Sequence, residues 1–199
     1  MPLIDLLRHG ETDSPGLLLG RTDASISEAG WQQMEQQTAG RGWDLIVASP
    51  LARACGPAQR IAQQHRLSAS IDPDWAEIDF GEWDGRAVAE LSTDPVTADA
   101  MDSLYRNPAD WVPPGGESWQ SLKERTARAL SRLVQQQDVE RVLVVSHAGP
   151  IRTAVSVACS LPFEKLWAIR IGYATRITLR VGADDNQQLW GEIVEIVQP

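Results

Sequence analysis

The stretch LIDLLRHGET at residues 3–12 joins a short, mostly apolar run directly to a cluster of polar residues. The run from Leu3 to Leu7 is typical of a buried β-strand. Arg8 and His9 follow at the point where that strand ends. In open α/β sheets, ligands bind outside the carboxyl ends of the strands. The stretch therefore predicts a central strand and one side of a binding site.

Strand-like and helix-like segments alternate along the rest of the chain. Buried strands appear as short apolar runs, and helices as apolar residues spaced three and four apart. This alternation predicts an α/β fold, a three-layer α/β/α sandwich with a mostly parallel central sheet. Strands are expected at residues 3–7, 45–48, 141–146, 173–181 and 189–196, and helices at 27–39, 51–64, 118–133 and after Pro150.

A glycine and a proline, Gly56 and Pro57, lie inside the second of these helical segments. A proline in a helix interior costs about 3 kcal/mol, because it removes one hydrogen bond and its ring clashes with the preceding turn. We therefore expect a kink or a fresh start of the helix at this point.

The length and charge of the chain limit what it can be. Its 199 residues correspond to one domain, and 27 acidic against 18 basic residues give a net charge of −9. That balance argues against nucleic acid and against an anionic membrane surface as partners. No apolar stretch is long enough to span a membrane, and the first residues lack the pattern of a secretion signal. With only two cysteines and no disulfide framework, we expect a cytoplasmic protein.

One segment of the predicted single domain (residues 1–199) differs in composition. Residues 72–102 contain ten acidic side chains and one basic one, Arg86, and a stretch rich in proline and glycine follows. The simpler interpretation is a solvated, charged helical face. The functional interpretation is a helical lid insertion, at about residues 72–117, that covers a site at the edge of the sheet.

Two histidines and two arginines lie at the ends of predicted strands. His9 follows Arg8, Arg53 lies just beyond the second strand, and His147 follows the strand at 141–146. A neutral histidine can attack phosphorus, and nearby arginines both disfavour its protonation and neutralise phosphoryl oxygens. Gly10 would let the backbone approach the anion closely. Either histidine alone would be taken for a core residue, but the pair beside arginines predicts a phosphoryl-transfer site.

Such a site also needs a proton donor for the leaving oxygen. Residues 74–83 contain several carboxylates, and Glu77 sits between apolar neighbours, where desolvation would raise its pKa toward the working pH. From the residues alone, Glu77, Asp79 and Glu82 all remain candidates.

Four motifs resemble those of the histidine phosphatase superfamily, the phosphoglycerate-mutase-like proteins. They are LLRHGET at residues 6–12, SPLARA at 49–54, EIDFGEWDG at 77–85 and VSHAG at 145–149. The resemblance covers nearly the whole chain. It implies that His9 is a nucleophile forming a phosphohistidine, that Glu77 is the proton donor, and that Arg8, Arg53 and His147 form the pocket for the phosphoryl oxygens.

Softer similarities point to one branch of the superfamily. Residues 20–23, 110–118 and 166–170 are most similar to the α-ribazole phosphatase branch. This similarity implies hydrolysis of a small phosphorylated metabolite, α-ribazole 5′-phosphate of cobalamin biosynthesis, without a cofactor or a metal. Besides the five residues above, the expected substrate contacts are Gly10, Thr12, Arg21, Thr22 and Ala148.

The alternatives are other uses of the same pocket. They are a phosphoglycerate mutase, a broad-specificity sugar-phosphate phosphatase, and a binding protein without activity. Mutases of this superfamily generally have more basic residues that grip the substrate between the proton donor and the second histidine. This chain has few lysines between Glu77 and His147, which favours hydrolysis. The binding protein is disfavoured because no member of the motif set is missing. Pro15 stands where many members have an asparagine that helps to bind phosphate. The oligomeric state stays open, with a homodimer as one candidate.

Overall fold

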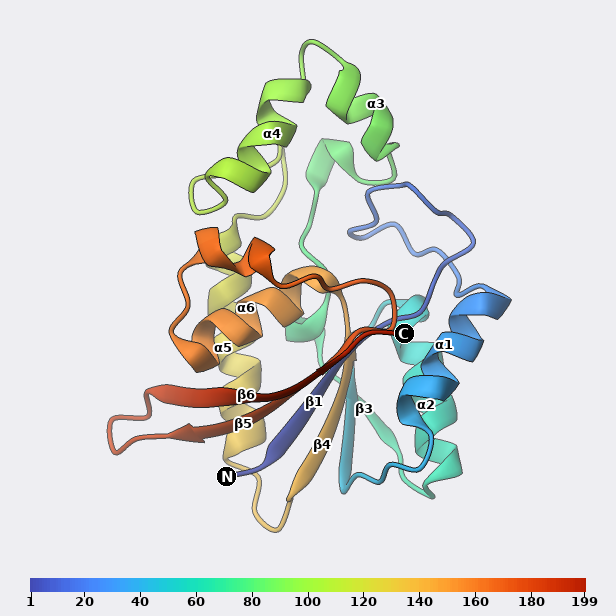
Figure 1. Cartoon of the computed structure of the whole chain (residues 1–199), viewed down its shortest axis with the longest axis vertical. Helices are drawn as coiled ribbons and strands as arrows, with labels where there is room; N and C mark the ends of the chain where they lie inside the picture. Colours follow the sequence, from blue (N-terminus) through green and yellow to red (C-terminus); the bar gives the residue numbers. More distant parts are fainter.

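The computed structural model describes residues 1–199 and contains a six-stranded mixed sheet (Figure 1). Its strand order is β3-β2-β4-β1-β5-β6. The first four of these pair in parallel, and β5 and β6 pair antiparallel at one side. The predicted fold class is confirmed. The strands are β1 (Leu3–Arg8), β2 (Leu45–Ala48), β3 (Ala69–Ile71), β4 (Arg141–Ser146), β5 (Arg176–Ala183) and β6 (Leu189–Val197).

Helices cover both faces of the sheet. One face packs against α1 (Glu28–Thr38) and α2 (Ala52–Gln64), and the other against α5 (Trp119–Val134) and α6 (Ala148–Cys159) (Figure 1). In β1, Leu6 lies in the core cluster beneath α5 and α6, whereas Leu7 lies in the cluster beneath α1 and α2. Because both faces are buried, the central strands are continuous apolar runs rather than alternating ones.

Helix α2 runs unbroken through Pro57, so the predicted fresh start there is wrong. Pro57 is buried, and Ala54, Ala58 and Ile61 on either side of it pack into the core beneath the helix. Burial of this apolar face offsets the hydrogen bond that the proline removes.

Two elements begin three residues away from their predicted starts. Helix α6 begins at Ala148 rather than after Pro150, since a proline in the first turn loses no intrahelical bond. Strand β5 begins at Arg176 rather than at Tyr173, because the segment before it forms a turn in which the N–H of Thr175 donates to the carbonyl of Gly172. The short edge strand β3 was not predicted.

Residues 72–117 form short helices beyond the carboxyl ends of the central strands (Figure 1). Apolar side chains between Ile78 and Trp111 form a cluster of their own, which includes Trp83, Leu91 and Leu104 and is joined to the main body by Trp119 and Leu122 of α5. Trp75 lies instead in the main core cluster. The elements are the 3₁₀-helices η1 (Pro73–Trp75) and η2 (Gly81–Trp83) and the helices α3 (Val88–Thr93) and α4 (Ala98–Arg106). A further 3₁₀-helix, η3 (Phe163–Ala168), follows α6. No helix combines the length and the apolar character that a membrane crossing requires.

Candidate active site

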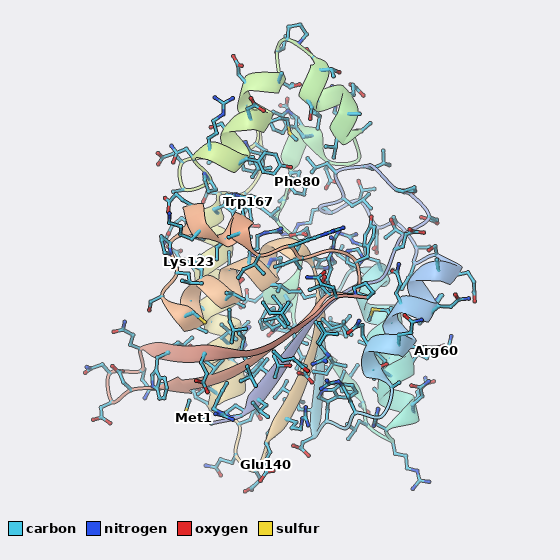
Figure 2. All side chains as sticks on the ribbon, viewed as in Figure 1. Met1, Arg60, Phe80, Lys123, Glu140 and Trp167 are labelled. Atoms are coloured by element: carbon cyan, nitrogen blue, oxygen red, sulfur yellow. The ribbon has the colours of Figure 1, made fainter.

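A cavity of about 270 Å³ lies at the carboxyl end of β1, between the sheet and the α3–α4 region. Arg8, His9 and Glu77 line it together with the first turn of α6. Phe80 and Trp167, which also line it, lie where the α3–α4 region meets the body of the molecule (Figure 2). A larger groove of about 530 Å³ lies between α5, α6 and the β5–β6 turn and contains none of these residues.

His9 is held as a neutral ring with one defined tautomer. Its side chain is buried, and Nδ1 lies 2.8 Å from the carbonyl oxygen of Gly10. A carbonyl can only accept, so Nδ1 carries the hydrogen and Nε2 keeps its lone pair. Burial lowers the pKa of His9 well below its ordinary value of 6.5, and the charges of Arg8 and Arg53 lower it further. Burial is thus a larger cause than the arginines on which the sequence argument relied.

His147 lies beside His9 at the start of α6. The two ring centroids are 5.1 Å apart, and Nε2 of His147 is 2.7 Å from the hydroxyl oxygen of Ser49. Burial lowers the pKa of His147 well below 6.5, with smaller contributions from His9 and the charge of Arg53. Ser49 was expected at a strand end, without a role in the site. Its hydroxyl can donate to Nε2, and His147 then carries its hydrogen on Nδ1.

Arg8 is half-buried and lines the cavity, whereas Arg53 and His147 are buried and do not line it. The charges of both arginines act on the ring of His9. Arg8 donates to the carbonyl of Ile171 at 2.8 Å and stacks on Tyr173, 4.3 Å from the ring centroid. Arg53 is fully buried and donates to three carbonyl groups of residues 19–22. The Nε–H of each guanidinium has no partner within the chain. Each arginine therefore has one buried N–H donor that no group of the chain accepts.

Glu77 is the only one of the three candidate carboxylates that lines the cavity. Its side chain is 8% exposed and accepts from the N–H of Ile78 at 2.9 Å and from the N–H of Gly149 at 3.1 Å. A Cβ at Gly149 would lie 2.2 Å from Oε1 of Glu77, so this position has no room for a side chain. Asp79 instead accepts from the N–H of Gly81. Glu82 is exposed outside the cavity.

The other expected substrate contacts separate into those that line the cavity and those that do not. Ala148 lines the cavity, but Gly10, Thr12, Arg21 and Thr22 do not. A Cβ at Gly10 would lie 2.2 Å from a backbone oxygen of α1, so the close approach that this glycine permits is to that helix. Thr12 is buried, while the half-exposed Arg21 lies 3.7 Å from a carboxylate of the 77–85 segment. Thr22 contributes its carbonyl to Arg53.

Arg152 is a cavity residue that the sequence analysis missed. Its guanidinium lies 4.4 Å from the ring centroid of Trp167, and its one hydrogen bond is to the carbonyl of Ala148 at 3.4 Å. Burial lowers its pKa to about 10. Helical spacing could have revealed it, because residues four apart share a helix face and Ala148 was already a candidate. No group of three or more metal-ligating side chains is present.

Two histidines held neutral make the stability of the fold depend on pH. An unfolded histidine titrates near about pH 6.5, whereas the pKa of His9 and of His147 in the fold is lower. Above the pKa of the unfolded histidine, both rings are neutral in the folded and in the unfolded chain, and the free energy of unfolding keeps its full value. Below that pKa the unfolded chain binds protons first, so the free energy of unfolding should fall by up to about 1.4 kcal/mol per pH unit for each histidine.

Denaturant unfolding between about pH 7.5 and pH 5 measures this dependence. His147→Gln removes one titrating group and should give a shallower slope than the wild type. An unchanged slope in this variant would show that His147 is not held neutral by the fold.

Comparison with known proteins identifies the family. Residues 4–192 match the model of the histidine phosphatase superfamily (branch 1). The adenosylcobalamin/alpha-ribazole phosphatase of Escherichia coli K12 is 30% identical over 175 residues, which are 83% of each chain. A probable phosphoglycerate mutase of Proteus mirabilis is 31% identical over 162 residues, 79% of this chain and 74% of the other.

The fold comparison agrees. The solved structure of a mycobacterial glucosyl-3-phosphoglycerate phosphatase has a TM-score of 0.85 and 26% identity, covering 97% of both chains. The chain thus belongs to the histidine phosphatase superfamily and is a phosphatase.

Proposed function

We propose that the protein hydrolyses phosphomonoesters through a phosphohistidine at Nε2 of His9. The observation that carries this proposal is the bond from Nδ1 of His9 to the carbonyl of Gly10, which leaves Nε2 unprotonated in a residue that lines the cavity. Burial keeps the ring neutral, as a nucleophile requires.

The reaction then has two steps. Nε2 attacks phosphorus, the ester P–O bond breaks, and protonated Glu77 gives its proton to the leaving oxygen. Water next gives a proton to the Glu77 carboxylate and attacks phosphorus, the P–N bond breaks, and inorganic phosphate leaves. Arg8 and Arg53 offer their free Nε–H groups to the phosphoryl oxygens, and His147 offers its Nδ1–H.

We further propose α-ribazole 5′-phosphate as the substrate. Twelve of the seventeen residues that line the cavity are hydrophobic, and a planar aromatic base fits such a lining better than a bare sugar does. The E. coli relative, whose name includes alpha-ribazole phosphatase, supports the same choice. The aromatic side chains are Phe80, Tyr105, Trp119, Trp167 and Tyr173.

Two esters with the same leaving oxygen test this assignment. α-Ribazole 5′-phosphate and ribose 5-phosphate share the ribose alkoxide and differ in the aromatic base. We expect kcat/KM to be at least about tenfold higher for the first, corresponding to about 1.4 kcal/mol from burial of the base. Equal values would contradict the assignment while leaving the phosphatase activity intact.

Arg152 favours a second candidate, a phosphoglycerate ester whose leaving group has a carboxylate. A cation without an acidic partner in an apolar cavity is well placed to pair with an anion of the substrate. The mycobacterial structure belongs to a phosphatase named for such an ester.

The second candidate predicts a charge-dependent preference. 3-Phosphoglycerate should be hydrolysed faster than glycerol 3-phosphate, which lacks the carboxylate, and Arg152→Met should remove about tenfold or more of that preference. A preference that survives Arg152→Met would exclude this role. With a bisphosphoglycerate primer, the same assay should release inorganic phosphate and form little 2-phosphoglycerate; rapid isomerisation would instead indicate a mutase.

A further inference from the structure

Arg125 of α5 has no assigned role, yet all five of its N–H donors are used. The side chain is buried, and its Nε–H and one Nη2–H donate to the two carboxylate oxygens of Glu117 at 2.7 and 2.9 Å. The other three hydrogens donate to the backbone carbonyls of Asp74, Ala76 and Glu77 at 2.7, 2.7 and 3.0 Å. One guanidinium thus holds the backbone of the segment that contains Glu77.

Glu117 also holds this segment, through two hydrogen bonds to the backbone of Asp79. Its Oε2 accepts from the N–H of Asp79 at 3.3 Å, and its own backbone N–H donates to the carbonyl of Asp79 at 2.9 Å. Residues 74–79 are therefore tied to the Arg125–Glu117 pair both before and after Glu77.

The side chain of Glu77 is held by backbone groups only. Its carboxylate accepts from the N–H groups of Ile78 and Gly149, and no other side chain bonds to it. A proton donor must lie within about 3 Å of the leaving oxygen, and misplacement by about 1 Å can cost about 100-fold in rate. The position of the carboxyl therefore depends on the backbone that the Arg125–Glu117 pair holds.

We propose that Arg125 and Glu117 are positioning residues for the proton donor, through which they act on the first step of the reaction. This proposal rests on the role given to Glu77 above. It differs from a purely structural role, in which the pair stabilises the fold and affects every substrate equally.

Leaving-group dependence separates the two roles. Arg125→Met should slow phosphoenzyme formation about 10- to 100-fold with ribose 5-phosphate, whose alkoxide needs a proton. With p-nitrophenyl phosphate, whose leaving group departs unprotonated, the same step should change less than about threefold. Glu117→Gln keeps the shape of its side chain and should give a smaller loss with the same selectivity.

The control variant is Arg128→Met on the same helix. Arg128 is 60% exposed and reaches only the carboxylate of Asp74, at 3.3 Å, so the rate with both substrates should stay unchanged. Thermal unfolding measures how far each variant is destabilised. If Arg125→Met does not fold, Glu117→Gln provides the same test.

The decisive comparison is made in the Glu77→Gln background. If the pair acts through Glu77, adding Arg125→Met or Glu117→Gln should slow phosphoenzyme formation from ribose 5-phosphate by less than about threefold more. A further 10-fold loss, or equal losses with both substrates in the single variants, would overturn the positioning role alone. If Glu77→Gln itself shows no selectivity, the proton-donor role fails and the positioning role fails with it.

Discussion

His9→Ala is expected to lower kcat by about 10⁴-fold or more, with the fold retained, because the variant has no nucleophile for the first step. The loss should be equally severe for p-nitrophenyl phosphate and for ribose 5-phosphate, since both must form the same phosphoenzyme. Steady-state kinetics over the two substrates, with circular dichroism to verify the fold, measures this effect.

The matched control uses the third histidine. His65 is the C-cap of α2, its ring packs beside that of Trp43, and it does not line the cavity. His65→Ala should keep turnover within a few-fold of the wild type. Substantial activity in His9→Ala would show that another group attacks phosphorus.

Glu77→Gln should have the second-largest effect, and its size should depend on the leaving group. The amide keeps the shape of the side chain but cannot deliver a proton, and general acid catalysis is worth about 10²–10⁴-fold. Phosphoenzyme formation should lose that amount with ribose 5-phosphate and much less with p-nitrophenyl phosphate. Burst kinetics are required, because Glu77 also activates the water of the second step and steady-state rates mix the two effects.

The neighbouring carboxylates provide the controls for this experiment. Asp79→Asn and Glu82→Gln change residues that lie outside the cavity lining. Neither should show the selective loss. A selective loss in one of these variants would move the donor role to that residue, and equal losses for both substrates in Glu77→Gln would remove Glu77 from it.

The sheet was predictable because its central strands are short runs of buried apolar residues. The strands at residues 45–48 and 141–146 have the predicted bounds, and Ser118 caps α5 as expected. The edge strand β3 was missed because only three residues pair in it and two of them are exposed. The unbroken course of α2 through Pro57 depends on tertiary burial, which overrides the local cost of a proline.

The candidate site was predictable where its residues follow strands. Arg8 ends β1, and His9 and His147 come directly after β1 and β4, which pair in parallel, so their proximity follows from the topology. Arg125 and Arg152 were missed because they sit inside helices, where an arginine is normally a surface residue. Only the packing of α5 and α6 against the 74–79 segment and the cavity shows what these two arginines contact.

The most direct test of the account is the identity of the phosphorylated atom. Glu77→Gln mixed with p-nitrophenyl phosphate should accumulate the phosphoenzyme, since its first step needs no proton and its second step is slowed. After an alkaline quench, mass spectrometry locates the phosphate, and ³¹P NMR distinguishes the two ring nitrogens. We expect an acid-labile phosphate on Nε2 of His9, because Nδ1 donates to the carbonyl of Gly10. Phosphate on Nδ1, on a serine or a cysteine, or on no residue during turnover would contradict it.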